Sequence, residues 1–205
     1  MPEFKIHNLW PIPIYEGEIP VKNEWKKYIE DVEYRRTHIG NSDISLNRYL
    51  LNEMPDLKSD IENHCESFAR KYLILSKNIK FVLQNSWSNI HYPGDQAQEH
   101  YHGNSLLSGV YYTHVPKNSG DIAFHKSSSY TNLFHNSIRM EYDESNNLQG
   151  ETYILPVKEG MIVMFPSHLT HSVLKNLSNE PRYSLAFNFW IKGKLGKEEY
   201  ILEFK

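Results

Sequence analysis

The sequence predicts a mainly β fold, a double-stranded β-helix (jelly roll) with two N-terminal helices packed outside it. Two observations carry this prediction. Between residues 21 and 72, apolar side chains recur every three or four positions in two segments, which is the period of an amphipathic helix. From residue 78 onward, about eight short strand-like runs are separated by turn sequences, a pattern typical of sandwiches and jelly rolls.

The length of the chain, 205 residues, fits a single domain with a full hydrophobic core. We expect three parts within this domain. Residues 1–77 form an N-terminal strap and the helices, residues 78–192 form the jelly-roll catalytic core, and residues 193–205 form a C-terminal tail.

The N-terminal part begins with an apolar run, Trp10 to Tyr15, that contains two prolines. Proline cannot occupy a helix interior or a central strand, so this run predicts an edge strand or a strap on the core. A first helix is expected over 21–36, a loop over 37–47, and a second helix over 54–72, with Pro55 near its start. The apolar positions are Trp25, Tyr28, Ile29 and Val32 in the first helix and Leu57, Ile61, Cys65, Phe68 and Tyr72 in the second.

The core is expected to consist of short strands joined by turns such as Pro93-Gly94-Asp95. The predicted strands cover 81–92, the segment with His100 and His102, 106–115, 121–125, 152–157, 161–165, 169–174 and 183–191. The tail, 192–205, is expected to be a short helix or strand.

One connection, residues 126–150, is long and polar. Loops of this length in compact domains are usually functional lids or mobile segments. Lys126, Tyr130, His135 and Arg139 are candidate substrate contacts there, although exposure to solvent is the preferred interpretation for each of them.

Composition excludes several classes of protein. The net charge is −3, from 22 basic and 25 acidic residues, and no block of Lys or Arg indicates binding to nucleic acid or to an anionic membrane. The first twenty residues hold no signal-peptide core, and no apolar run is long enough to span a bilayer. A lone cysteine, Cys65, excludes an internal disulfide and fits a reducing cytoplasm, so a cytoplasmic location is expected. The oligomeric state stays open.

Three histidines form a candidate metal site. His100 and His102 are two residues apart, so in an extended strand both imidazoles point into the same space. A distant histidine, His171 or His168, would complete a facial set of three ligands and leave positions open for oxygen and a chelating co-substrate. His168 and His171 face opposite ways on a strand, and His171 is preferred for its place along the strand and its spacing to Arg182. The usual set is two histidines and one carboxylate, and here His102 occupies the carboxylate position.

Arg182 is a candidate anion-binding residue. Its planar guanidinium can bind a carboxylate through two parallel hydrogen bonds, which lysine cannot do. An arginine that faces the inside of a barrel needs an anionic partner, because a buried unpaired charge is costly. Ser184 lies two residues further on, faces the same way, and can donate to the same carboxylate.

These residues resemble the Fe(II)/2-oxoglutarate-dependent oxygenase superfamily, and more closely a 2OG-Fe(II) oxygenase family of phage and bacterial proteins. The resemblance covers roughly residues 80–192. The matching residues are Ser86-Trp87-Ser88-Asn89, Gly94, His100-Tyr101-His102, Ser108-Gly109-Val110-Tyr111-Tyr112, Ser119 to Phe124, Gly160, Phe165-Pro166-Ser167, His171, Arg182-Tyr183-Ser184 and Asn188.

The resemblance implies Fe(II) and 2-oxoglutarate as cofactors. His100 and His171 take the iron-binding places, and Arg182 with Ser184 takes the Arg-x-Ser place for the distal carboxylate of 2-oxoglutarate. Tyr112 resembles a tyrosine that assists this arginine in prolyl-hydroxylase-like members. His102 departs from the superfamily's His-x-Asp/Glu pattern. No catalytic residue beyond the metal ligands is indicated.

The expected activity is hydroxylation of an unidentified substrate, a small molecule or a peptide, with O2 as oxidant and succinate and CO2 as co-products. Two alternatives stay open. A three-histidine cupin-type dioxygenase would use no 2-oxoglutarate and would bind its substrate directly to iron. A non-catalytic jelly-roll binding module would have no reason to keep inward-facing imidazoles and a guanidinium together.

Overall fold

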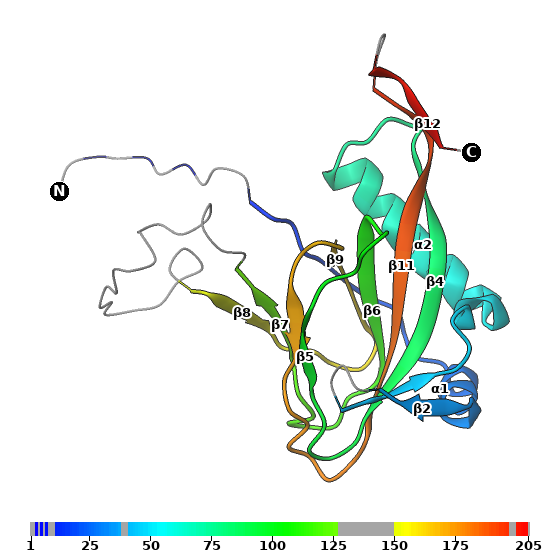
Figure 1. Ribbon diagram of the computed structural model, residues 1–205, viewed down its shortest axis with the longest axis vertical. Coiled ribbons are helices and arrows are strands. Elements are labelled where there is room, and N and C mark those ends of the chain that lie inside the picture. Colours follow the sequence, from blue (N-terminus) through cyan, green and yellow to red (C-terminus); the bar gives the residue numbers. More distant parts are fainter. Residues whose placement is uncertain are drawn as a thin grey trace.

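Two antiparallel sheets make up most of the regular secondary structure of the described chain (Figure 1). The computed structural model describes Glu3, Lys5, His7 and residues 11–37, 41–126, 150–196 and 200–204. Within these residues the larger sheet has eight strands in the order β1-β9-β6-β11-β4-β3-β2, with β12 paired to β11. The smaller sheet has four strands in the order β5-β10-β7-β8. The chain is therefore mainly β, as predicted.

The strands follow the predicted pattern from residue 80 onward. The larger sheet consists of β1 (Tyr15–Glu18), β2 (Tyr34–Arg36), β3 (Asp43–Ser45), β4 (Lys80–His91), β6 (Leu107–His114), β9 (Met161–Pro166), β11 (Arg182–Leu195) and β12 (Leu202–Phe204). The smaller sheet consists of β5 (Ala97–His100), β7 (Ile122–His125), β8 (Thr152–Leu155) and β10 (His171–Val173).

The two faces of the larger sheet pack against different parts of the protein, because side chains alternate between the faces along each strand. On one face, Leu185 and Phe187 of β11 join the main hydrophobic cluster together with helix residues. On the other face, Tyr112 and Phe165 pack against Phe124 of the smaller sheet. Arg182, Ser184 and Asn188 alternate with the first set in sequence, so they belong to the face between the sheets.

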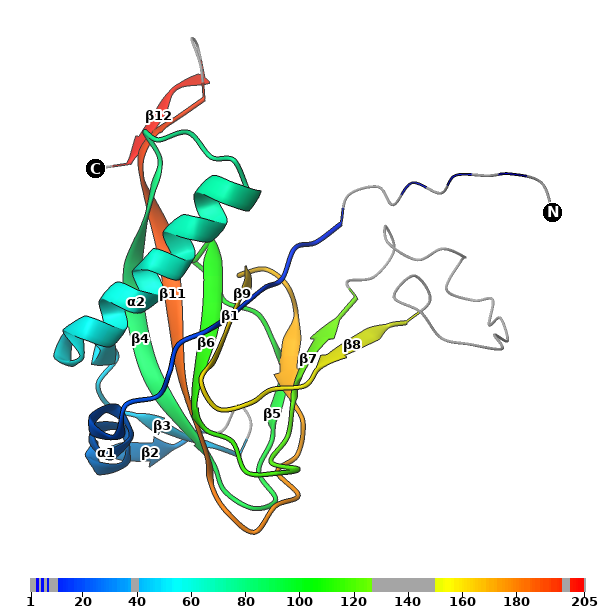
Figure 2. The same ribbon diagram turned by 180° about the vertical axis from the view of Figure 1, so that it is seen from behind.

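Both predicted helices are present. Helix α1 covers Asn23–Asp31, and helix α2 covers Pro55–Ser67 and continues as one π-helical turn, Phe68–Tyr72. A 3-10 turn, Leu50–Glu53, precedes α2. The buried side chains of both helices lie in the main cluster with residues of β6, β9 and β11. Figure 2 shows α2 running across the larger sheet on the side away from the smaller one.

Two expectations for the N-terminal part of the fold were wrong in their boundaries, whereas the tail, expected to be a short helix or strand, does contain strand. The first helix stops at Asp31, because Val32 adopts an extended conformation, and Tyr34–Arg36 then forms strand β2. The expected loop 37–47 contains strand β3, which pairs with both β2 and β4. Strand β11 continues into the expected tail as far as Leu195 and pairs there with β12.

Parts of two predicted segments lie outside the described residues. Of the long connection 126–150, residues 127–149 are not described, and these include Tyr130, His135 and Arg139. Trp10 in the N-terminal strap is also outside the described part. No helix among the described residues has the length and apolar character needed to cross a membrane.

Candidate metal centre

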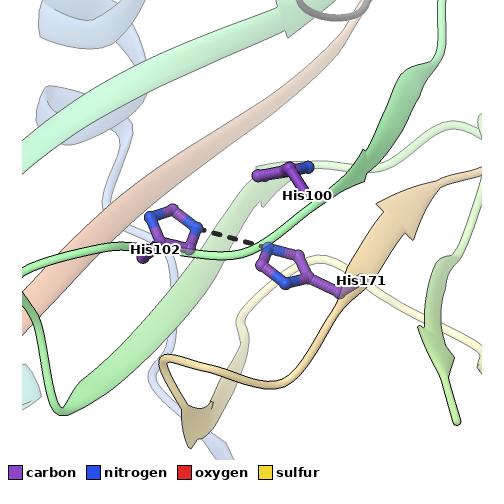
Figure 3. A group of neighbouring side chains, drawn as sticks. All are labelled: His100, His102 and His171. Carbon is purple, nitrogen blue, oxygen red and sulfur yellow. Dashed lines mark hydrogen bonds between the residues drawn. The ribbon is translucent and has the colours of Figure 1, made fainter. Parts of the chain in front are cut away.

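Three imidazoles meet between the two sheets (Figure 3). His100 ends β5, His171 begins β10, and the two residues are paired across these strands. His102 lies two residues beyond β5, and its backbone N–H donates to the carbonyl of Ser167 at 2.9 Å. One ligand atom from each ring lies within 4.8 Å of the others. The structure thus brings together the three predicted residues, although His102 follows the strand rather than lying in it.

Backbone hydrogen bonds orient two of the rings. Nδ1 of His100 donates to the carbonyl of Gln98 at 2.7 Å, and Nδ1 of His171 donates to the carbonyl of Leu169 at 2.9 Å. A proton on Nδ1 leaves the lone pair on Nε2, which is the atom that would bind a metal. Nε2 of His171 lies 3.3 Å from Nε2 of His102. Two imidazoles that bind one metal at 2.0–2.1 Å and roughly right angles have their nitrogens about 3 Å apart, so this donor set fits a divalent cation.

Two of the rings, those of His102 and His171, are neutral at physiological pH. Burial, and secondly the neighbouring His100, lowers the pKa of His102 to about 4 and that of His171 to about 3. A protonated imidazole cannot coordinate a metal. Both lone pairs are therefore available without the release of a proton.

His168 is not part of this cluster. Its side chain is exposed, whereas only 4% of His171 is exposed. Two aromatic rings close the cluster on its sides: Phe165 lies edge-on to His171 at 4.6 Å between ring centroids, and Trp87 lies 5.7 Å from His102. Sequence reasoning missed these two contacts, although the alternation of β4 and β9 places both side chains on the face between the sheets.

A buried chain of polar side chains fixes the turn that supports His102. The amide of Asn188 accepts from Ser108 at 2.7 Å, and the hydroxyl of Ser108 lies 2.8 Å from that of Ser167. Asn188 in turn donates to Asn85 at 2.9 Å. Because the carbonyl of Ser167 holds the backbone of His102, this chain ties the candidate ligand to strands β4, β6 and β11.

Arg182 is fully buried on the same inner face. Its Nη1 donates to the carbonyl of Gly120 at 2.6 Å, its Nη2 donates to Nδ1 of His91 at 3.2 Å, and its Nε has no partner. Burial lowers its pKa, and no carboxylate among the described residues pairs with it. Since a buried unpaired cation is unfavourable, Arg182 is well suited to bind an anion.

Gly120 is needed for this arrangement. Its φ of +91° lies in the left-handed region, and a Cβ there would lie 2.1 Å from the carbonyl oxygen of Leu174. Only glycine fits this turn and presents its carbonyl to Arg182.

Tyr112 and Ser184 lie beside Arg182. They are register partners on β6 and β11, and the Cζ atom of Arg182 lies 5.7 Å from the centroid of the Tyr112 ring. Burial raises the pKa of Tyr112 to about 12, so its hydroxyl is a neutral donor. Ser184 is two residues along β11 from Ala186, the register partner of Trp87, and Arg182 is two further. At about 3.3 Å per residue, the backbone of Arg182 lies roughly 13 Å along β11 from Ala186, the position opposite Trp87, and this distance leaves room for a chain-like dicarboxylate.

His91 gives the first testable expectation. It is 3% exposed, and burial together with the charges of Arg182 and Arg36 holds its pKa well below the usual value. The unfolded chain therefore binds more protons below pH 6.5, and the free energy of unfolding decreases as pH falls below 6.5. A His91→Asn variant keeps an acceptor for Arg182 but does not titrate. Urea unfolding of the metal-free protein between pH 7.5 and 5.5 should show a slope shallower by up to about 1.4 kcal/mol per pH unit. Equal slopes would contradict the neutral, buried state of His91.

The fold and the site together define a mainly β protein with a three-histidine cluster that could hold a metal ion, and with a buried arginine that no carboxylate of the described residues pairs with. A family profile described as "Putative 2OG-Fe(II) oxygenase" matches residues 85–188. The matched residues include the three histidines of the cluster, and also Arg182, Ser184 and Tyr112. No protein of curated function matches the chain in a sequence comparison.

Solved structures of low sequence identity share the fold. An oxidoreductase of the 2OG-Fe(II) oxygenase family from Burkholderia pseudomallei has a TM-score of 0.59 at 9% identity, covering 81% of this chain and 76% of its own. A prolyl-4-hydroxylase from Pseudomonas putida has a TM-score of 0.57 at 13% identity, with coverages of 87% and 92%. HygX from Streptomyces hygroscopicus, with nickel, 2-oxoglutarate and hygromycin B bound, has a TM-score of 0.58 at 10% identity, with coverages of 87% and 82%.

The chain belongs to the 2OG-Fe(II) oxygenase family. It is a 2-oxoglutarate-dependent non-haem iron oxygenase, and its cofactors are Fe(II) and 2-oxoglutarate.

Proposed function

We propose that this oxygenase hydroxylates its substrate at a metal centre made by His100, His102 and His171, with succinate and CO2 as co-products. Arg182, Ser184 and Tyr112 would hold the distal carboxylate of 2-oxoglutarate. The two facing sheets would form a double-stranded β-helix with α1 and α2 packed outside, in one domain that covers residues 1–205. The observation that carries the proposal is Arg182, a buried guanidinium without a carboxylate partner in the described chain, on the same sheet face as the imidazole cluster.

Each residue has a distinct task in this proposal. The three imidazoles would hold the metal, because one ligand nitrogen of each ring converges on one place and the Nδ1 protons of His100 and His171 are fixed by backbone carbonyls. Bound iron supplies the activation of O2, coupled to the oxidative decarboxylation of 2-oxoglutarate. Arg182 has five N–H donors, of which Gly120 and His91 use two, so the rest can bind and orient the co-substrate.

The side chains around the cluster exclude water. Phe165 is 1% exposed and Trp87 is 9% exposed, and both rings lie against the histidines. A dry site strengthens the pairing of Arg182 with a carboxylate, because charge interactions are stronger at low dielectric constant. The presence of 2-oxoglutarate and a metal in HygX, which shares the fold, supports this assignment.

Anaerobic titration tests the proposal. Protein loaded with Fe(II) should develop a metal-to-ligand absorption band when 2-oxoglutarate is added, and in air it should release succinate. A three-histidine dioxygenase that binds its substrate directly to iron would give no such band, and neither would a binding module without iron. Absence of the band would therefore reject the proposal in favour of one of these two classes.

The role of His102 is open to a direct test by substitution. Because its ring lies in the place of the family's carboxylate, His102→Asp restores the common set of ligands and is expected to keep a competent iron site. His102→Gly opens a coordination position, and the metal should bind more weakly, by on the order of 10- to 100-fold or more. Both are measured by anaerobic Fe(II) titration and succinate release. Equal iron affinity of the parent and the Gly variant would remove His102 from the ligand set.

A further inference from the structure

On the side of the candidate metal centre where His102 lies, side-chain contacts extend from His102 through Trp87 to Arg48 at the surface. Trp87 lies against His102, and the guanidinium carbon of Arg48 lies 4.9 Å from the centroid of the Trp87 ring. The carbonyl of Arg48 accepts from the backbone N–H of Ser86 at 2.8 Å, which fixes the arginine's backbone against β4. The side chain of Arg48 is exposed, whereas Trp87 is buried. Arg48 thus forms the outer layer of a stack that ends at the candidate metal ligand.

A second arginine lies on the same face. Arg35 of β2 pairs in register with Ile44 of β3, and Ile44 pairs with Asn89 of β4. Register partners in antiparallel strands share a face. Ile44 packs with Trp87 and Ala186, so this face is the one that carries the metal centre. Arg35 therefore lies at the edge of the sheet, on the approach to the centre.

Neither arginine has a counter-ion in the described chain. The acids next to β2, Asp43 and Asp95, are both taken by Arg36, which points to the opposite face. No ion pair or side-chain hydrogen bond of Arg35 or Arg48 occurs among the described residues. Although Arg48 lies at the surface, its guanidinium is partly covered, and this partial burial lowers its pKa. The charge of Arg35 lowers the same pKa further, so the two cations repel each other.

From this arrangement, and resting on the proposed function, we infer that the substrate carries an anionic group, a carboxylate or a phosphate, which Arg35 and Arg48 bind at the entrance to the metal centre. An anion between the two guanidinium groups replaces their repulsion with two charge-assisted hydrogen-bonding contacts. Asn89 is the register partner of Ile44, on the same face of the sheet as Arg35. Its side-chain amide has no hydrogen-bond partner in the described chain and offers a further donor. The neutral part of the substrate then extends past Trp87 toward the metal.

The face has features that a purely structural role does not require. A cation over one ring stabilises a protein by only about 0.5–1 kcal/mol at an exposed site, and a single arginine is enough for that contact. Two like charges without a paired acid among the described residues, beside the stack of Trp87 on His102, are unfavourable in the absence of an anion. The 2-oxoglutarate carboxylate does not take this place, because Arg182 lies four residues along β11 from Ala186, away from Trp87.

Two simple anions serve as probes in the test. Protein loaded with Fe(II) and 2-oxoglutarate is titrated anaerobically with inorganic phosphate and, separately, with acetate, by calorimetry and with the 2-oxoglutarate absorption band recorded throughout. We expect saturable binding of at least one anion with the band retained, and the tighter of the two identifies the phosphate or carboxylate class. The double variant Arg35→Gln/Arg48→Gln should bind the anion at least roughly 10-fold more weakly and keep its 2-oxoglutarate affinity and its uncoupled succinate release.

A matched control removes the same number of charges elsewhere. Lys27 of α1 and Lys71 of the π-helical turn are exposed, and their elements pack on the opposite face of the larger sheet. The double variant Lys27→Gln/Lys71→Gln should bind the anion like the parent.

Three outcomes overturn the inference: no saturable binding of either anion, equal binding by parent and Arg35→Gln/Arg48→Gln, or an equal loss in the lysine control. Loss of the absorption band in the parent protein would instead reject the proposed function. The single variants repeat the comparison if the double variant does not fold.

Discussion

A His171→Ala variant is expected to lose the divalent metal and to keep its fold. Loss of a residue that merely orients a ligand already weakens metal binding 10- to 100-fold, so removal of a ligand should cost on the order of 100-fold or more. The ring contributes an edge contact with Phe165, but the two large apolar clusters do not contain it. Anaerobic Fe(II) titration gives the affinity, and circular dichroism reports on the fold.

The matched control for this experiment is His168→Ala. His168 is exposed and lies three residues before His171, so its removal should leave the metal affinity unchanged. If the His171 variant binds iron as tightly as the parent and the His168 variant does not, the distal ligand is His168.

Arg182→Lys is expected to weaken 2-oxoglutarate binding by about 1.5–3 kcal/mol, roughly 10- to 150-fold. Lysine keeps the charge, but it cannot form two parallel hydrogen bonds with a carboxylate. It also cannot reach Gly120 and His91 at once, so the ammonium would not be held in the orientation of the guanidinium. The absorption band of the Fe(II) complex, followed against 2-oxoglutarate concentration, gives the affinity.

Arg70→Lys is the control for this substitution. Arg70 also donates to backbone carbonyls, those of Leu75, Ser76 and Ile79. It lies in the π-helical turn after α2, which packs on the face of the larger sheet opposite to Arg182. Its replacement should leave 2-oxoglutarate affinity as in the parent. Unchanged affinity in Arg182→Lys would place the co-substrate elsewhere and favour a dioxygenase that binds its substrate directly to iron.

The sequence was sufficient to predict the three histidines because their spacing has direct geometric meaning. Two histidines two residues apart point the same way in an extended segment, and this stays true of His102 beyond the end of β5. The long strands β4, β6, β9 and β11 were also predicted, since each contains an unbroken apolar or alternating run. An arginine that faces the inside of a barrel needs an anionic partner, and the position of Arg182 in a predicted strand was enough to suggest this role.

Contacts between distant segments could not be predicted in this way. Strands β2 and β3 have three residues each, too few for a periodic signal. They are stabilised by pairing, β3 with β4 and β2 with β3. The contact of Trp87 with His102, and that of Arg48 with Trp87, depend on how β4 lies beside the loop after β5. His91 looked like an ordinary strand residue, and only the pairing of His91 with Arg182 reveals it as the acceptor for the guanidinium.

A metal held by His102 and His171 would cross-link two segments that lie 69 residues apart in the chain. In the unfolded chain these side chains are far apart, and bringing them together costs loop-closure entropy that rises with the logarithm of the loop length. A metal that binds only the folded chain stabilises it by RT ln(1 + [M]/Kd), about 2.7 kcal/mol at a free metal concentration of 100 Kd. The loop that the metal closes contains β6, β7, β8 and β9, strands of both sheets. Metal-loaded protein is therefore expected to resist proteolysis longer than the metal-free protein does.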